Sequence, residues 1–263
     1  MALERSRLLA GWSIQAKYIY ALLVRDMIMR YGRGNIGFTW VVLEPMILTA
    51  GVLIIWPVMG ASKYGIKIVE LVFTGYMLLT LWRHITNNAV NLFRNSASLL
   101  YHRRVTLLDI VIARQGLEFI GASTALVAIW VVLYNVGAAA EIQRPDLLLG
   151  GWFLMGWIAI ACAMILAALT EVSQLAERFI QPFQYLNIPI SGAFFLVDWL
   201  PPWGQKLILY HPLVHSYELF RAGYFGSSVI THYDVAYAVA WAFGLSFLGI
   251  LAVNGIRSRV RLT

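Results

Sequence analysis

The stretch RYGRGNIGFTWVVLEPMILTAGVLIIWPVMG, residues 30–60, decides the fold. It begins with Arg30 and Arg33 among glycines, and from Phe38 it becomes an apolar run that continues to Gly60. A run of this length can cross the hydrocarbon core of a bilayer, and the cations before it lie where lipid phosphates would be. The stretch therefore predicts a membrane span that begins on the cytoplasmic side.

The composition extends this interpretation to the whole chain. The 263 residues are 60% hydrophobic and only 13% charged, with a mean hydropathy of +0.71. About a quarter of the residues of a soluble domain are charged, so this chain has too little polar surface to cover a soluble protein. Its apolar residues form continuous runs and do not alternate with polar ones, which argues against a transmembrane barrel. We therefore predict an all-α membrane protein.

The apolar runs predict six transmembrane helices in a single transmembrane domain, residues 1–263. The predicted spans are residues 38–60, 68–91, 107–134, 147–170, 179–197 and 235–256, and Pro182 and Pro189 are expected to kink or break the fifth. The domain divides into four parts, which are a cytoplasmic interface helix (1–34), spans one to five (35–197), an outer segment (198–234), and span six with the tail (235–263).

Two segments outside these spans have their own patterns. The residues from Trp12 to Tyr31 predict an amphipathic helix that lies in the cytoplasmic interface without crossing it. The segment 198–234 is aromatic and apolar, but prolines and glycines interrupt it, so it should form short re-entrant or interfacial helices at the outer leaflet. The polar first residues predict no cleavable signal peptide, so the first span is expected to direct insertion.

The distribution of cations predicts the orientation. The chain has 20 Lys and Arg residues and a net charge of +7. With six spans and both termini in the cytoplasm, the outer side receives only Lys63, Lys67, Arg144, Lys206 and Arg221. This excess of positive charge inside is typical of multi-pass membrane proteins, so the charge does not predict a nucleic-acid partner.

Motifs of catalysis are scarce. The sequence has no G-x-x-x-x-G-K-[ST] motif and no H-E-x-x-H motif, so an ATP site of the phosphate-loop kind is not expected in this chain. His211, His215 and Glu218 could form a metal site on one helical face, although Pro212 disfavours helix at His211. An integral membrane enzyme with that site is therefore the alternative to a transporter.

Three motifs resemble the permease subunits of type-two ABC exporters, and within them the capsular polysaccharide export family. They are RYGRGNIGFTWVVLEP (30–45), LLYHRRVTLLDIVIARQGLE (99–118) and YHPLVHSYELFRAGYFG (210–226). The resemblance covers nearly the whole chain. It implies a homodimer in the Gram-negative inner membrane, driven by a separate cytoplasmic ATPase that binds the ATP and Mg, with no cofactor in this chain. It also implies a lipid-linked polysaccharide substrate and a periplasmic co-polymerase or outer-membrane export partner.

The resemblance assigns roles to particular residues. The coupling helix that contacts the ATPase would contain Asn95, Ser96, Leu99, Leu100, Tyr101, His102 and Arg103. A gate for the lipid-phosphate end of the polymer would contain Arg25, Arg30 and Arg33, and the outer re-entrant segment would contain His211, His215, Glu218 and Arg221. At Arg104 and Leu107 the chain departs from the prolines that many relatives carry near the coupling turn.

Aromatic and acidic side chains are the candidates for the path of the polymer. Hydrated sugars stack on aromatic rings, although most interfacial aromatic residues only anchor the protein in the bilayer. An acid inside a span is a functional candidate by default. The candidates for the path are Trp40, Glu44, Tyr185, Trp199, Trp203 and Tyr210. A lipid, drug or teichoic-acid permease stays open as another substrate class, and Arg114 and Glu118, four residues apart, are predicted to form a structural pair.

Overall fold

The computed structural model describes residues 15, 17–26, 28, 47, 66–97 and 105–257, and every regular element in these ranges is a helix. Several sequence predictions lie outside the described residues. They are the first span apart from position 47, most of the coupling segment, and the tail beyond Arg257, together with Arg30, Arg33, Trp40, Glu44, Leu99, Leu100, Tyr101, His102 and Arg103.

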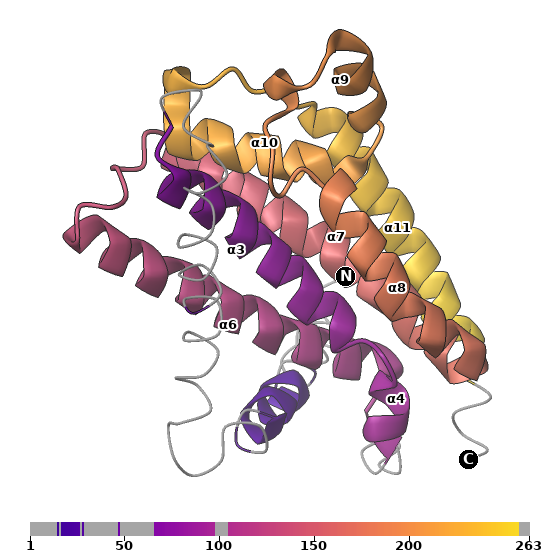
Figure 1. Cartoon of the computed structure of the whole chain (residues 1–263). Coiled ribbons are helices and arrows are strands. Elements are labelled where there is room, and N and C mark those ends of the chain that lie inside the picture. The colour runs from indigo at the N-terminus through magenta and orange to yellow at the C-terminus, as the bar shows by residue number, and fades with distance from the viewer. Residues whose placement is uncertain are drawn as a thin grey trace, which may run out of the picture.

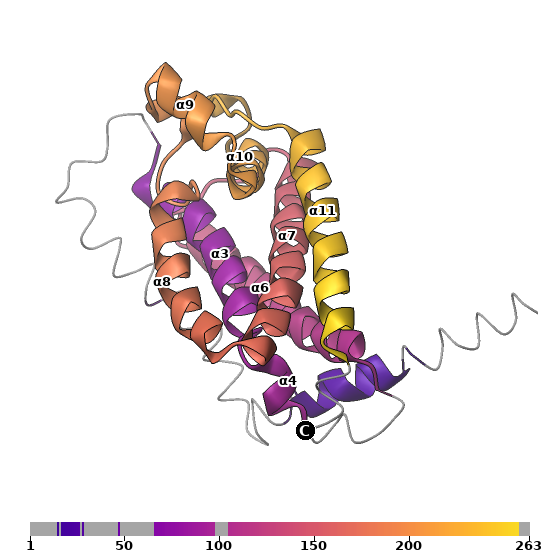
Figure 2. The ribbon, with the colours of Figure 1, turned by 90° about the vertical axis from the view of Figure 1, so that its right-hand side faces the viewer.

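Long helices form a bundle that runs between two ends of the molecule (Figures 1 and 2). They are α3 (Ile68–Asn87), α6 (Leu107–Asn135), α7 (Pro145–Val172), α8 (Gln174–Ile190) and α11 (Val235–Gly255). Within the described ranges, α3, α6, α7 and α11 are long and apolar enough to cross a membrane. These four correspond to the predicted spans two, three, four and six.

Short helices lie at the two ends of the bundle. One end has α4 (Leu92–Asn95) and the helical residues 17–26, and Figure 2 places the last described part of α11 there as well. The opposite end has α9 (Pro202–Ile208) and α10 (Pro212–Phe225), with the 3-10 helices η2 (Val197–Trp199) and η3 (Gly226–Ser228) beside them. The segment after span five therefore forms short helices, as predicted.

Helix α7 is the centre of the packing. Its neighbours are α3, α10 and α11, and its buried positions include Trp152, Met155 and Ile158. Two glycines bring the α7 and α10 backbones into contact, because a Cβ at Gly151 would lie 2.5 Å from the Phe220 nitrogen and one at Gly223 would lie 2.1 Å from the Leu148 nitrogen. Small residues allow this kind of close approach between membrane helices.

Side-chain caps fix where several helices begin. Thr106 and Asp109 form a reciprocal capping box at the start of α6. The Asp234 carboxylate accepts a hydrogen bond from the Tyr237 N–H (3.0 Å) at the start of α11, and the Ser173 hydroxyl accepts one from the Ala176 N–H (3.4 Å) at the start of α8. Such caps satisfy amide groups that the first turn of a helix leaves without partners.

The prediction for span five is wrong in its boundaries. It placed the span at 179–197 and so left residues 171–178 outside the predicted spans, whereas α8 already begins at Gln174 and ends at Ile190. The helix starts early because Ser173 caps it, so the polar residues that follow Ser173 are helical and do not form a loop. Pro182 and Pro189 are both inside α8, and the helix ends one residue after the second, at Ile190, two residues before Gly192, whose φ is +91°. Similarly, α3 ends at Asn87, before the predicted Asn91.

Candidate functional site

The N-terminal helical residues are fastened to α6 by polar contacts. The Gln15 amide donates a hydrogen bond to the Asp109 carboxylate (2.6 Å), and Asp26 lies 3.6 Å from the Arg114 guanidinium. Arg25, the described member of the predicted gate, has a half-exposed side chain 3.7 Å from Asp26. The helix that is predicted to gate the path is therefore held against the start of α6.

The predicted pair of Arg114 and Glu118 is confirmed, with 4.0 Å between the Arg114 Nε and a Glu118 oxygen. The pair belongs to a larger network, because Arg114 also donates to the Asn88 side chain (3.3 Å) and Glu118 lies 3.9 Å from the His84 ring. The network joins α3, α6 and the N-terminal helix close to the end of the bundle where α4 lies.

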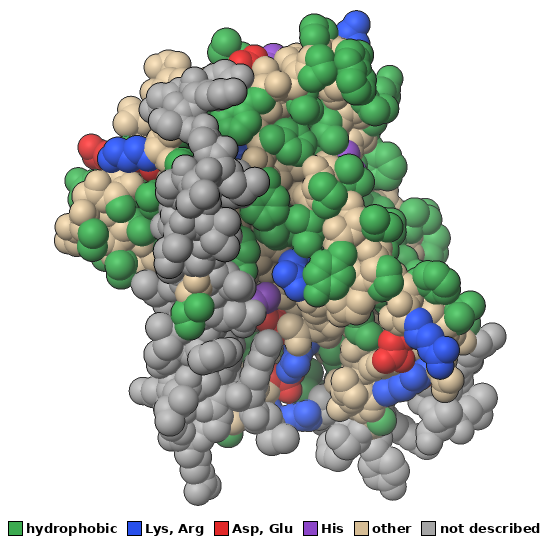
Figure 3. Space-filling view, in the orientation of Figure 1, with side chains coloured by type: hydrophobic (Ala, Val, Ile, Leu, Met, Phe, Trp, Pro, Cys, Tyr) green, Lys and Arg blue, Asp and Glu red, His purple; other side chains and the backbone are tan. Residues whose placement is uncertain are grey.

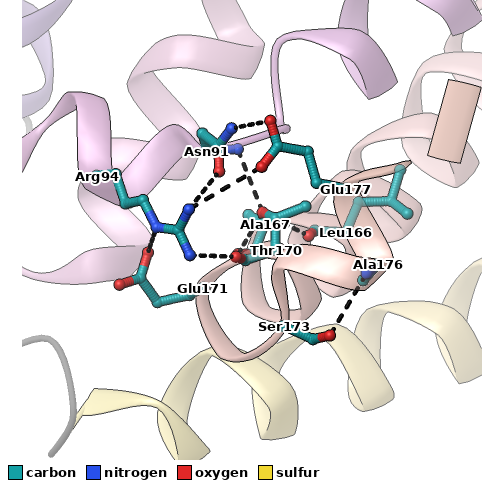
Figure 4. A network of polar contacts seen from close by, with 9 residues as sticks. All are labelled: Asn91, Arg94, Leu166, Ala167, Thr170, Glu171, Ser173, Ala176 and Glu177. Atoms are coloured by element: carbon teal, nitrogen blue, oxygen red, sulfur yellow. Dashed lines mark hydrogen bonds and ion pairs between the residues drawn. The ribbon is translucent and has the colours of Figure 1, made fainter. Parts of the chain in front are cut away.

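A second network, which we call the α4 clamp, consists of Asn91, Arg94, Thr170, Glu171 and Glu177 (Figure 4). The Asn91 amide donates to Glu177 (2.7 Å), and the Asn91 backbone N–H donates to the Thr170 hydroxyl (3.2 Å). Arg94 donates to the Thr170 carbonyl (3.0 Å) and lies 4.0 Å from both Glu171 and Glu177. The clamp connects the turn before α4 to the elbow between α7 and α8.

Two residues of the predicted coupling segment are described. Asn95 is the last residue of α4 and Ser96 follows it as the C-cap. Both therefore lie one turn or less from Arg94, at the end of the molecule where the N-terminal helix also lies (Figures 1 and 2). Sequence reasoning assigned Asn95 and Ser96 but missed the clamp beside them.

Helix α8 presents a broad apolar surface. Its buried side chains are Ile180, Gln184 and Asn187, whereas the exposed ones include Phe179, Phe183, Tyr185, Leu186 and Ile190. In Figure 3 hydrophobic side chains cover much of the visible surface over α8, α9 and α11, and charged ones gather mainly toward the α4 end. Arg83 of α3 lies over the ring of Tyr185, 5.5 Å from its centroid, so this path candidate already has a cation beside it.

The other aromatic candidates lie at the opposite end of the molecule. Trp203 of α9 is 72% exposed and Tyr210 is 74% exposed, whereas Trp199 of η2 is half-buried. The Tyr210 carbonyl accepts a hydrogen bond from the Tyr237 hydroxyl (2.8 Å). The structure therefore does not bring Tyr185 together with Trp203 and Tyr210, since they belong to different parts of the fold.

Arg221 and Glu218 organise the outer segment from within α10. The fully buried Arg221 guanidinium donates to the carbonyls of Gly192, Ala193 and Phe195, at 2.8 Å for the first two, and lies 3.9 Å from Glu218. Glu218 accepts hydrogen bonds from the Val197 N–H (3.3 Å) and the His232 N–H (2.8 Å). Burial raises the pKa of the Glu218 carboxyl, and the Arg221 charge opposes this effect. The two charges thus hold the loops on either side of α9 and α10.

The geometry gives the metal-site alternative no support. Both ring nitrogens of His215 are used, because Nε2 lies 2.8 Å from the Leu209 carbonyl and Nδ1 accepts from the Asp234 N–H (2.9 Å). Burial lowers the pKa of His215 and of His211. Glu218 accepts hydrogen bonds from two backbone amides. The described residues contain no group of three His, Cys, Asp or Glu that could hold a metal ion.

Sequence reasoning missed two features of the site, and the sequence offers only a weak signal for each. Arg221 was assigned to the outer segment and counted among the cations of the outer side, but its role as a buried donor to carbonyls of a loop nearly thirty residues away was not predicted. Glu171 and Glu177 fall between the predicted spans four and five, and no contact was predicted for them. Two acids that flank a helix-capping serine are consistent with a helix start, but nothing in the sequence indicates that Asn91 and Arg94 reach them.

Comparison with known proteins identifies the family. Residues 17–225 match the family model described as ABC-2 type transporter. The chain is 37% identical to the capsule polysaccharide export inner-membrane protein CtrC of Neisseria meningitidis serogroup B (strain ATCC BAA-335 / MC58), over 96% of each chain. It is 36% identical to the capsule polysaccharide export inner-membrane protein BexB of Haemophilus influenzae, over 92% of each chain. The polysialic acid transport protein KpsM of Escherichia coli is 23% identical, over 97% of this chain and 98% of its own. The chain therefore belongs to the ABC-2 type transporter family of membrane proteins.

Proposed function

We propose that this chain is the membrane subunit of an exporter that moves capsular or related polysaccharide across the bacterial inner membrane. The observation that carries the proposal is the end-to-end similarity to relatives that are named as capsule polysaccharide export inner-membrane proteins, at 34–37% identity. The four apolar helices long enough to cross a membrane are consistent with a multi-pass protein.

The energy for export comes from a separate ATPase subunit that binds the ATP and Mg, and it acts on residues 95–103. This part of the proposal is supported by the position of α4, which lies at the end of the bundle together with the N-terminal helix. Cationic side chains at that end, Arg94 and Arg114 among them, favour a cytoplasmic location under the positive-inside rule. The same rule supports six spans, with α8 and the run 38–60 as the remaining two and both termini inside.

The active unit is a homodimer whose two copies enclose the polymer path. Support comes from α8, which exposes aromatic and aliphatic side chains over most of its length although, with 17 residues, it is too short to count among the apolar spans. Residues of α8 and of the first span would line the path, with Tyr185 as a sugar contact. Arg25 and its neighbours Arg30 and Arg33 would bind the lipid phosphate, and α9 and α10 would close the outer side, where a periplasmic export partner would receive the polymer.

A deletion strain complemented with this chain tests the proposal. We expect loss of surface polysaccharide and accumulation of polymer inside the cell, both reversed by the unchanged chain. Polar substitution of Leu99, Leu100 and Tyr101 should prevent export while the protein still reaches the membrane. Normal surface polysaccharide in the deletion strain would contradict the proposal, and a change in lipid, teichoic acid or drug resistance alone would point to another substrate class.

A further inference from the structure

We propose that the α4 clamp is the joint through which movement of the coupling segment reaches α8. This inference rests on the proposed function, because it concerns how an ATPase contact at residues 95–103 would drive the path helix. The clamp is the place where the turn before α4 is bound by side chains to both α7 and α8 (Figure 4).

The first argument is that the coupling segment follows the clamp directly. Arg94 and Asn95 form the last turn of α4, and Ser96 ends that helix. Asn91 begins it, and its own contacts lie on two different helices, with its backbone N–H on Thr170 of α7 and its amide on Glu177 of α8. A displacement of α4 therefore acts on the α7–α8 elbow through short hydrogen bonds.

The second argument is that Asn91 is held in an unusual conformation. Its φ of 55° lies in the left-handed region, and within the described residues it is the one residue other than glycine with a positive φ. Asparagine tolerates this region better than most residues, and such conformations persist where surrounding contacts determine them. With its backbone and its side chain both bound, Asn91 cannot absorb a movement of α4 by changing its dihedral angles without breaking the clamp.

The third argument is the difference between the two helices that the clamp touches. Helix α7 is packed against α3, α10 and α11, so it is the fixed side. Helix α8 buries only Ile180, Gln184 and Asn187, and a single extended residue, Ser173, joins it to α7. Because Glu177 lies in the first turn of α8, a pull on its carboxylate turns the helix about Ser173. The exposed aromatic face of α8 would move with it.

A reversal of hydrogen-bond polarity tests the joint. The substitution Asn91→Asp keeps the size of the side chain and its tolerance of the left-handed region, but it places a carboxylate against Glu177. The substitution Glu177→Gln alone keeps an amide–amide hydrogen bond. The double variant N91D/E177Q restores the contact with donor and acceptor exchanged. Asn135→Asp is the matched control, because Asn135 is exposed at the far end of α6 and its side chain bonds to the Val131 carbonyl of its own helix.

Two quantities are measured. ATP hydrolysis is measured on the complete exporter, purified from cells through a tag on this chain, and exported polymer is measured as surface polysaccharide. We expect N91D to lower polymer exported per ATP hydrolysed at least about fivefold, the lower end of typical coupling between sites. E177Q and N135D should stay close to the unchanged chain, and N91D/E177Q should recover most of the loss. Should N91D fail to accumulate, Arg94→Met removes the clamp's contacts between Arg94 and Thr170, Glu171 and Glu177 from a half-exposed position, and it should also lower the polymer exported per ATP.

The outcomes separate the joint from the proposed function. Export per ATP that is unchanged in both N91D and R94M would overturn the joint, and so would an N91D defect that E177Q does not relieve. If the unchanged chain neither restores surface polysaccharide to the deletion strain nor purifies with an ATPase, the proposed function fails instead.

Discussion

Removal of the Arg221 guanidinium should destabilise the outer segment. The substitution Arg221→Met keeps most of the length of the side chain but removes every donor. It leaves the carbonyls of Gly192, Ala193 and Phe195 without their partner, and it leaves Glu218, 1% exposed, without the cation 3.9 Å away. The perturbation therefore acts on the loop after α8 and on the loop before α11 together.

The size of the effect follows from burial. Removal of one partner from a buried ion pair typically costs about 3–5 kcal/mol, because the other charge stays desolvated without compensation. For a chain of this size about 4 kcal/mol corresponds to a fall in the melting temperature on the order of 10 °C. Part of the cost is a rise in the pKa of Glu218, whose charged form Arg221 stabilises. The variant should therefore destabilise the protein less at a pH where Glu218 is protonated.

Thermal unfolding of the detergent-solubilised protein, followed by tryptophan fluorescence, measures this effect. Arg144→Met is the matched control, since Arg144 pairs with Asp146 at 2.8 Å but both side chains are well exposed. We expect the control to melt close to the unchanged chain, because surface pairs contribute little. If R221M has the same melting temperature as the control, the buried guanidinium does not hold the outer segment and the reasoning is refuted.

Two further predictions concern helix contacts. Asp26→Asn removes the charge that faces Arg114 at 3.6 Å, so hydrogen exchange in residues 17–26 should become about twofold faster, as expected for the loss of a partly exposed ion pair worth about 0.5 kcal/mol. Glu141→Gln serves as the control, and equal exchange rates in the two variants would contradict the contact. Gly223→Val should fail to accumulate in membranes, because even its Cβ would lie 2.1 Å from the Leu148 nitrogen. Gly244→Val should accumulate normally, because a Cβ there would meet no atom of the described residues within 4 Å, and equal accumulation of the two variants would refute the close contact of α7 and α10.

The sequence was sufficient to predict the helices that bury continuous apolar runs. The bounds of α6, α7 and α11 agree with the predicted spans within about two residues, because hydropathy decides where such helices begin and end. Helix α8 was harder to predict, since its start depends on the Ser173 cap and not on hydropathy. The pairing of Arg114 with Glu118 could be predicted from a spacing of four residues, and it is present.

The rest of the candidate site depends on contacts between distant parts of the chain. Arg94 reaches Thr170, 76 residues away, and Asn91 reaches Glu177, 86 residues away. Periodicity and local spacing contain no information about such pairs. Glu218 shows the consequence, because its spacing from His215 suggested a metal ligand, whereas its actual partners are the amides of Val197 and His232 and the charge of Arg221.

The central claim is that the α4 end of this chain faces the cytoplasm, where a separate ATPase can contact it. Labelling of single cysteines in intact cells with a membrane-impermeant maleimide tests the claim directly, on a background in which Cys162 is replaced by alanine. A cysteine at Arg103, beyond α4, should be protected until the cells are opened, and one at the exposed Arg144, between α6 and α7, should react at once from the periplasmic side. Labelling of position 103 in intact cells with protection of position 144 would contradict the account.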